Sequence, residues 1–269
     1  MNNYILIYES SLRLGIFTCV LTFVALWEII APRRKLNVNK TYRWINNLGL
    51  TCLNTLVLRL LFPLAASGVA IIAQRHSFGI FNLWHFSSWW IVLISVILLD
   101  LAIYLQHVLF HKVGFLWKLH QVHHADLDYD VTTGARFHTL EIILSMVIKF
   151  GVVLALGVPA LAVVIFEILL NATAMFNHGN IRLPLKLDKV LRLVVVTPDM
   201  HRVHHSVVWR ELNSNFGFNL PWWDRWFKTY QAQPELGQLK MIIGLDYLLE
   251  TKAAQNLGKM LQLPFKKLK

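Results

Sequence analysis

Long apolar runs are the feature that most constrains what this sequence can fold into. A helix needs about 18 to 20 predominantly apolar residues to cross the ~30 Å hydrocarbon layer of a bilayer. Three runs meet that length with a single charged residue each: Glu28 in residues 14–31, Arg59 in residues 48–73 and Asp100 in residues 89–106. The sequence therefore predicts three membrane-spanning helices.

A fourth apolar run, residues 142–178, is too long for one crossing. Gly157 and Pro159 lie near its middle, and both residue types interrupt helices. We interpret the run as a helical hairpin that either spans the membrane or re-enters it from one side. The predicted fold class is an all-α integral membrane helical bundle, with three spans, the hairpin, and a cytosolic histidine-rich metal-binding cap.

The distribution of basic residues predicts the orientation in the membrane. Between the first two runs lie Arg33, Arg34, Lys35, Lys40 and Arg43. The connection at residues 74–88 contains only Arg75, so the positive-inside rule places residues 32–47 in the cytoplasm. Counting crossings puts the segments with the histidine motifs on the same side. The formal net charge of +11 is spread over segments beside the predicted spans, which favours contact with anionic lipid over nucleic-acid binding.

Ten of the 12 histidines lie between residues 107 and 205. Residues three or four apart project from the same face of a helix. One pair and two triplets have that spacing: His107 and His111; His120, His123 and His124; His201, His204 and His205. His138 and His178 lie at the two ends of the predicted hairpin. The sequence therefore predicts ten nitrogen donors on one side of the membrane.

These clusters indicate a metal site. A lone histidine is more often an interfacial or core residue, but eight clustered imidazoles would leave many polar atoms unsatisfied, at about 1–3 kcal/mol each. Ten donors suit two ions better than one. An all-imidazole site admits zinc, copper, iron or nickel. The two cysteines, Cys19 and Cys52, lie inside predicted spans, which weakens the case for a structural zinc site.

Three residues near the histidines are candidate catalytic residues: Asp100, Tyr104 and Glu141. A carboxylate inside a membrane span indicates function. Asp100 precedes Tyr104 by four residues and His107 by seven, so the three share one helix face. We expect Asp100 to accept the second ring N–H of a ligand histidine, and Glu141 to play a similar part.

Six stretches resemble, in order and spacing, the fatty acid hydroxylase and sterol desaturase superfamily of membrane di-iron oxygenases. They are HVLFH (107–111), HQVHH (120–124), RFHTLE (136–141), FNHGN (176–180), TPDMHRVHHS (197–206) and NFG followed by WWDRWFKTY (215–230). Three histidine boxes, HxxxH, HxxHH and HxxHH, are the hallmark of that family. The resemblance covers about residues 95–230. Thr139, Gly179 and Lys228 depart from the family's common residues, and none of them stands in place of a histidine.

The resemblance implies a cytosolic cap that holds two iron ions, for which zinc can substitute in purified protein. Carried over position by position, it implies as metal ligands His107, His111, His120, His123, His124, His138, His178, His201, His204 and His205. It also implies that the protein uses O2 and two electrons to hydroxylate or desaturate a lipid, such as a fatty acyl chain or a sterol.

The electrons are expected to come from another protein. The sequence has no glycine-rich nucleotide motif, so no residues are assigned to an organic cofactor. The resemblance implies a separate ferredoxin, or a cytochrome with its reductase. We expect that partner to dock on basic residues, with Lys112, Lys118, Lys186 and Arg192 as candidates.

The sequence also predicts three regions along the chain. They are an N-terminal transmembrane region at residues 1–94, a di-metal domain at 95–230 and an amphipathic, basic C-terminal tail at 231–269. The expected protein is multi-pass, with its active site facing the cytoplasm. For so compact a chain, a bacterial inner membrane is favoured over the endoplasmic reticulum. The oligomeric state and the identity of the lipid are left open.

Two other functions compete with a lipid oxygenase. A membrane di-zinc hydrolase would use the same donors to activate water, and would need neither oxygen nor a reductant. A metal transporter or sensor would hold its ligands near the bilayer midplane. Nearly all the clustered histidines lie beyond the ends of the predicted spans, which argues against a transporter. The resemblance makes the oxygenase the favoured hypothesis.

Overall fold

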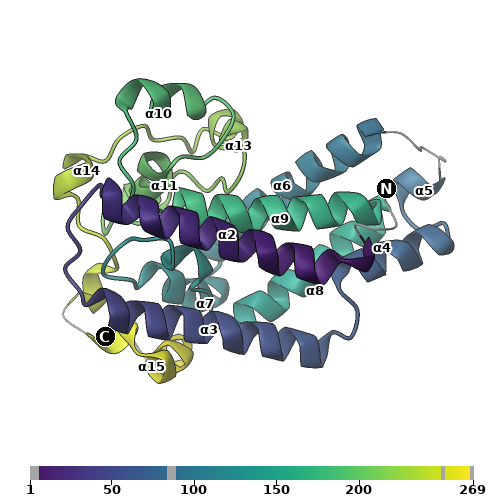
Figure 1. Ribbon diagram of the computed structural model, residues 1–269, viewed down its shortest axis with the longest axis horizontal. Helices are drawn as coiled ribbons and strands as arrows, with labels where there is room; N and C mark the ends of the chain where they lie inside the picture. The colour runs from purple at the N-terminus through teal and green to yellow at the C-terminus, as the bar shows by residue number, and fades with distance from the viewer. Residues whose placement is uncertain (1–5, 84–88, 250–251, 267–269) are drawn as a thin grey trace.

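The computed structural model describes residues 6–83, 89–249 and 252–266. Within these ranges the fold is built from helices, and its only β-type pairings are isolated bridges. Figure 1 shows long helices running side by side, with short helices gathered where α2 (Glu9–Ile30) ends and α3 (Lys40–Leu61) begins. The predicted all-α class is confirmed.

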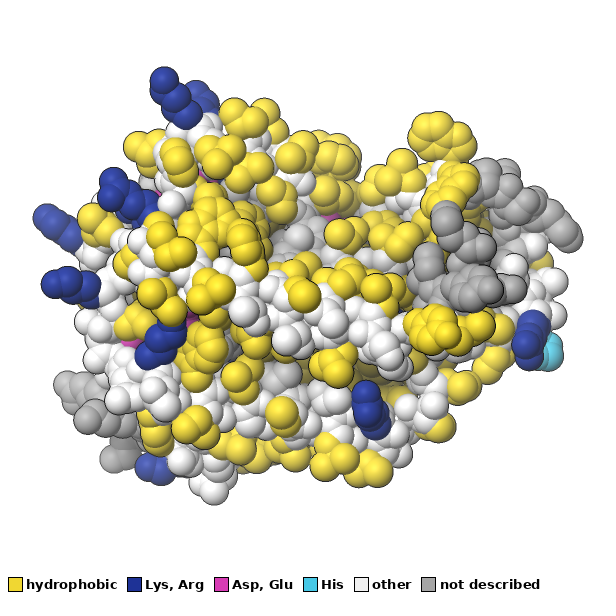
Figure 2. All heavy atoms as spheres, in the orientation of Figure 1, with side chains coloured by type: hydrophobic (Ala, Val, Ile, Leu, Met, Phe, Trp, Pro, Cys, Tyr) yellow, Lys and Arg dark blue, Asp and Glu magenta, His cyan; other side chains and the backbone are white. Residues whose placement is uncertain are grey.

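Five helical segments are long and apolar enough to cross a membrane. They are α2, α3 with the α4 that follows it (Ala66–Arg75), α6 (Trp89–Lys112), α8 (Thr139–Leu156) and α9 (Ala160–Asn177). Large apolar side chains on them are exposed, among them Ile30, Leu60 and Trp90. Figure 2 shows such side chains spread over the long helices. An apolar surface of this extent requires a partner such as lipid, and the chain is an integral membrane protein.

The helices at the second predicted span, residues 48–73, have limits that differ from those of the apolar run. Helix α3 begins eight residues earlier because the side chain of Asn39 caps it, accepting the backbone N–H of Tyr42 at 2.9 Å. The helix breaks before α4 because Pro63 forces the preceding residue, Phe62, into an extended conformation. The first two turns of α3, expected to be loop, therefore reach beyond the apolar run towards the short helices.

The hairpin prediction is confirmed. Gly157, at φ 69°, ends α8, and Pro159 immediately precedes α9. Each helix has 18 residues, which gives about 27 Å at 1.5 Å per residue. Helix α9 packs against α2, α4 and α6 and has the largest buried share of the five segments. It therefore forms the centre of the bundle.

The short helices form a cap at one end of the bundle. They are α7 (Gly114–His124), η1 (Thr133–Ala135), α10 (Leu185–Leu191), α11 (Pro198–His204), α12 (Trp209–Leu212), α13 (Trp222–Trp226), α14 (Gly237–Lys240), η2 (Asp246–Leu248), η3 (Lys252–Gln255), α15 (Leu257–Gln262) and η4 (Leu263–Phe265). Most of the Lys and Arg side chains visible in Figure 2 lie at this end. The C-terminal segments pack back onto the fold, α15 against α3 and η4 against α7.

The opposite end of the bundle carries α4, α5 (Ile80–Leu83) and the first turn of α6. His76, one of the two histidines outside the clusters, is exposed there. The other, His85, lies outside the described residues.

Candidate metal centre

Nine of the ten predicted ligand histidines gather into two groups inside the cap. Within each group, one ring nitrogen from every member lies within 4.8 Å of the others. The first group is His107, His111, His120, His124 and His204; the second is His123, His178, His201 and His205. All nine side chains are buried. The structure therefore brings together residues from four separate parts of the sequence.

Four helices position these histidines. The last two turns of α6 carry the pair at 107 and 111, α7 carries the triplet at 120–124, and α11 with its C-cap residue carries the triplet at 201–205. His178 is the C-cap of α9. The pair and the triplets lie on helices as their spacing predicts. Because each triplet turns along its helix axis, α7 and α11 each contribute to both groups.

The ring nitrogens face one another at short range. In the first group, Nε2 of His107 lies 3.1 Å from Nε2 of His120 and 3.0 Å from Nε2 of His204. In the second, Nε2 of His178 lies 3.1 Å from Nε2 of His123 and 3.2 Å from Nε2 of His205. Two nitrogens this close need either a proton or a cation between them.

In the first group, the hydrogen bonds on the far side of the rings exclude a shared proton. Nδ1 of His107 donates to the carbonyl of Phe216, and Nδ1 of His204 donates to the carbonyl of Ser214, both at 2.7 Å. A carbonyl only accepts, so the hydrogen of each neutral ring is on Nδ1 and Nε2 presents a lone pair. Two lone pairs therefore face each other between His107 and His204.

The second group repeats the arrangement. Nδ1 of His178 donates to the carbonyl of Ala174 at 2.7 Å, and Nδ1 of His123 donates to the carbonyl of Arg136 at 3.2 Å. The two Nε2 atoms that face each other are therefore both lone-pair bearers. Each group thus contains at least one pair of opposed acceptors.

Protonation of a second ring nitrogen does not relieve this repulsion. Burial lowers the pKa of His120 and of His178 to about 3. Burial, together with the neighbouring histidines, also holds the pKa of His123 and of His204 well below the ordinary value of 6.5. Burial therefore disfavours the protonated form of these four rings.

A metal ion in each group would satisfy the facing Nε2 atoms. Imidazole nitrogens bind transition-metal ions at about 2.0–2.1 Å, so two ligands at right angles on one ion lie about 3.0 Å apart, as the facing Nε2 atoms do. Both ring nitrogens of His201 are buried without a hydrogen-bond partner among the described residues, so that ring also has a lone pair free for an ion. The donor set therefore fits two transition-metal ions.

Glu141 lies where a ligand-orienting carboxylate is expected. From the first turn of α8 its Oε1 accepts Nδ1–H of His120 at 2.7 Å, which leaves Nε2 of that ring free to bind. Carboxylate–histidine–metal arrangements fix the tautomer of the ring and raise its basicity.

Replacement of Glu141 tests this role. We expect Glu141→Ala to weaken metal binding by about 10- to 100-fold, the usual cost of losing a carboxylate behind a ligand histidine. Glu141→Gln is the matched variant, because its amide oxygen can still accept the His120 N–H, and a smaller loss is expected. Metal retention against a chelator measures both. Equal retention by the wild type and Glu141→Ala would show that the carboxylate does not support a ligand.

The other two candidate catalytic residues make their hydrogen bonds outside the two histidine groups. Asp100 does not orient a ligand: its Oδ2 accepts Nε1–H of Trp223 at 2.8 Å and the backbone N–H of Leu220 at 3.2 Å. The hydroxyl of Tyr104 lies 2.9 Å from Oγ1 of Thr229. Seven residues along a helix correspond to about 10 Å, which is why sharing a face with His107 does not bring Asp100 into contact with it.

His138 is the one predicted ligand that the structure does not bring to either group. It is the N-cap of α8, with Nδ1 accepting the backbone N–H of Leu140 at 3.2 Å. Its Nε2 lies 3.2 Å from the carbonyl of Leu261 in α15. Both nitrogens thus have partners elsewhere.

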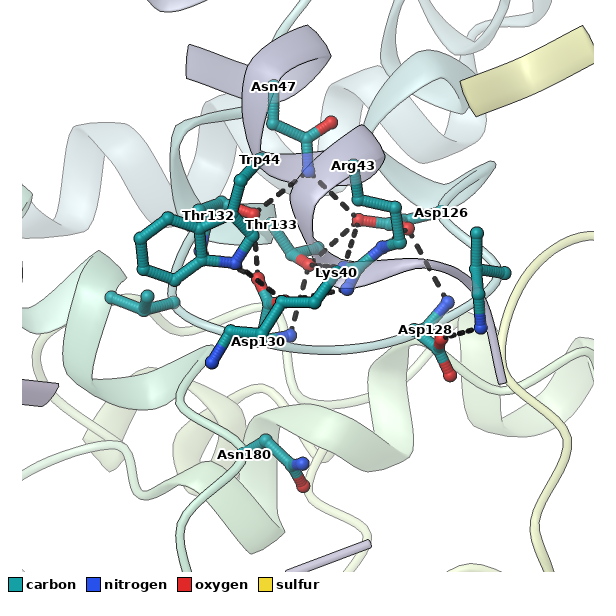
Figure 3. Close-up of polar contacts among 12 residues, drawn as sticks. Lys40, Arg43, Trp44, Asn47, Asp126, Asp128, Asp130, Thr132, Thr133 and Asn180 are labelled. Carbon is teal, nitrogen blue, oxygen red and sulfur yellow. Dashed lines mark hydrogen bonds and ion pairs between the residues drawn. The ribbon is translucent and has the colours of Figure 1, made fainter. Parts of the chain in front are cut away.

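A buried ion-pair network supports the loop after α7, and sequence reasoning did not find it. Arg43 of α3 makes a bidentate pair with Asp126 at 2.8 Å and reaches Asp130 at 2.6 Å. Figure 3 shows the guanidinium of Arg43 pointing at these carboxylates, with Thr133 and Asn47 beside them. These side chains fix the loop that joins the His120–His124 triplet to α8.

Aromatic rings close the space around the histidines. Phe137 stacks on His123 with ring centroids 4.4 Å apart, and Tyr129 stacks on His178 at 5.3 Å. Trp117 packs against His111 at 4.9 Å. Such apolar walls exclude water and hold the rings in place.

A comparison with protein families matches residues 92–229 to the fatty acid hydroxylase family model. All nine histidines of the two groups lie within the matched residues. That match is more than half of the 269 residues. The chain belongs to the fatty acid hydroxylase family. The resemblance seen in the histidine boxes is thereby confirmed.

A lipid hydroxylase and several alkylglycerol monooxygenases are similar to the chain. The ornithine lipid hydroxylase OlsE of Rhizobium tropici is 25% identical over 226 residues, which cover 81% of this chain and 67% of that protein. The alkylglycerol monooxygenase of Xenopus tropicalis is 26% identical over 215 residues, 76% of this chain and 44% of that protein. The alkylglycerol monooxygenase of Danio rerio is 31% identical over 164 residues, which cover 61% of this chain and 34% of that protein. The chain spans less than half of these two monooxygenases. No solved structure matches it.

Proposed function

We propose that this protein is a membrane-bound di-iron lipid hydroxylase. The observation that carries the proposal is the pair of buried histidine groups, in which opposed lone pairs lie 3.0 Å apart in one group and 3.1 Å in the other. They lie within a fatty acid hydroxylase domain. The similarity to a lipid hydroxylase and to alkylglycerol monooxygenases supports a lipid substrate and an oxygenase reaction.

Nine residues would hold the two ions, five in the first group and four in the second. An all-imidazole set admits zinc, copper, nickel and iron, and the oxygenase relatives favour iron. Two bound iron ions would supply the oxidation of an unactivated C–H bond by O2. The overall reaction balances as lipid C–H plus O2, two electrons and two protons, giving lipid C–OH and water.

The chain's own residues orient the donors and keep the site dry. The carbonyls of Phe216 and Ser214 hold their histidines in the tautomer that exposes Nε2. Glu141 does the same for His120. The buried position of the rings excludes bulk water, so that the reactive centre meets the lipid rather than solvent.

The electron donor is proposed to be a separate protein that meets exposed basic residues of the cap. Lys112, Lys118 and Lys186 are exposed and suit that role. Arg192 does not, because it is buried, with Nε 2.7 Å from Oδ2 of Asp188. The concentration of Lys and Arg at the cap end (Figure 2) supports a cytoplasmic position for the site, and we propose a bacterial inner membrane.

Lipid analysis of cells with and without the gene tests the proposed function. The expected result is a lipid species 16 mass units heavier that appears only when the gene and O2 are both present. A variant in which His107 and His123 are both alanine is the inactive control. A change of minus 2 would indicate desaturation instead. Product formed without O2, or by protein that contains zinc and no iron, would refute the oxygenase proposal and favour a hydrolase.

A further inference from the structure

A polar pocket lies outside the metal centre, between the end of α2 and the start of α3. Its volume is about 710 Å³. The charged residues that line it are Glu28, Arg33, Arg34, Lys35 and Lys40. Four cations and one carboxylate thus line the pocket, which gives its lining a net positive charge.

Two of these cations have carboxylate partners. Arg33 makes hydrogen bonds to Asp199 at 3.0 and 3.1 Å through Nε. Nζ of Lys40 lies 3.5 Å from Glu28. In Figure 3 the amine of Lys40 points away from the Arg43–Asp126 pair, towards the side on which Asn180 lies.

Arg34 and Lys35 have no carboxylate partner among the described residues. Nη2 of Arg34 donates to the carbonyl of Met241 at 2.7 Å, whereas its Nη1 is buried and has no partner. A buried guanidinium donor without an acceptor is unfavourable. Arg34 and Lys35 therefore bring to the pocket positive charge that no ion pair with a described residue neutralises.

The wall of this pocket is bonded to the loop that follows His178. Asn180, which lines the pocket, comes two residues after His178. Its side chain accepts the backbone N–H of Arg34 at 3.0 Å and donates to the carbonyl of the same residue at 2.8 Å. The loop that carries His178 and the loop that carries the cations are thus bonded to each other.

We propose that this pocket binds the anionic group, a phosphate or a carboxylate, of a bilayer lipid. A guanidinium binds either group through paired hydrogen bonds. The pocket lies at the ends of two membrane helices, where lipid headgroups are found, and a concave site suits a headgroup better than the face of an acidic protein. That the bound lipid is also the substrate rests on the proposed function.

Binding of short-chain lipids to the detergent-purified protein tests the pocket without turnover. We expect dihexanoylphosphatidylglycerol, which is anionic, to bind about tenfold more tightly than dihexanoylphosphatidylcholine. Arg34→Gln should weaken the binding of dihexanoylphosphatidylglycerol by about tenfold, because a charge-assisted contact is lost. Lys35→Gln should weaken it severalfold, and because Lys35 is exposed this variant does not endanger folding. Lys259→Gln, an exposed lysine in α15, is the matched control and should bind like the wild type.

Three results would overturn the proposal. They are equal binding of the two lipids by the wild type, unchanged binding by Arg34→Gln, and displacement of the lipid by inorganic phosphate at equal concentration. The last would assign the pocket to a soluble anion. Iron content is measured on the same samples. Because lipid binding and iron content are separate readouts, failure of the pocket and failure of the metal proposal can be distinguished.

Discussion

Replacing His204 with alanine is expected to abolish lipid hydroxylation and to remove one of the two proposed metal ions. Nε2 of His204 faces Nε2 of His107 at 3.0 Å, and its own Nδ1–H is held by the carbonyl of Ser214. Alanine offers no donor, so the first group loses a ligand outright. Loss of a residue that only orients a ligand histidine usually lowers activity about 10- to 100-fold. The loss caused by His204→Ala should be larger than that.

Metal analysis and turnover of the purified variant measure this prediction together. His76→Ala is the matched control, because His76 is exposed at the opposite end of the bundle. The control should keep both ions and full activity. If His204→Ala kept wild-type turnover, His204 would not be a ligand, and the argument from opposed lone pairs would fail for the first group.

Arg43→Met is expected to lower the free energy of unfolding by about 3–5 kcal/mol, the usual cost of removing one partner from a buried ion pair. The guanidinium is fully buried between Asp126 and Asp130, and methionine leaves two carboxylates there uncompensated. The loop that follows the His120–His124 triplet should then loosen, so metal retention should fall as well.

The dependence of stability on pH gives a second readout for this network. Burial alone would raise the pKa of Asp126, but Arg43 and Arg136 hold it below the ordinary 3.8. A carboxyl with a lowered pKa in the folded state contributes stability that is present above pH 3.8 and is lost as the pH falls further. Arg43→Met should reduce that loss.

Denaturant titration in detergent measures the stability of Arg43→Met. Arg59→Met is the matched control, since Arg59 is an exposed arginine in the same helix, and it should change the free energy of unfolding by less than about 1 kcal/mol. Similar stability of the two variants would show that the Arg43 network does not support the loop.

The membrane helices could be predicted from the sequence because lipid imposes both a length and a composition on a span. The residues at which these helices begin and end could not be predicted in the same way. The start of α3 is polar, and Arg43 appeared to be a loop cation. It is buried because carboxylates about 85 positions later in the chain meet it in the folded state, and no local pattern records that pairing.

The two histidine groups were predictable for a similar reason. Helical spacing brings the histidines of each triplet to neighbouring positions before any tertiary contact forms. Spacing did not show that His138 caps a helix or that Asp100 bonds to Trp223, since both depend on the packing of distant segments. Backbone carbonyls that accept Nδ1–H of the histidines were also missed. They belong to Phe216, Ser214, Ala174 and Arg136. Every residue has a backbone carbonyl, so the sequence does not indicate which ones will face a histidine.

Arg136 links the second histidine group to the C-terminal part of the chain. Its backbone carbonyl accepts the N–H of His123, while its guanidinium donates to the carbonyl of Ala254 and to the side chain of Gln255. Gln255 in turn donates to the carbonyl of Ala125 at 2.9 Å. During synthesis, these bonds can form only after residue 255 has left the ribosome. The support of His123 is therefore completed by a segment that lies about 120 positions after Arg136 in the chain.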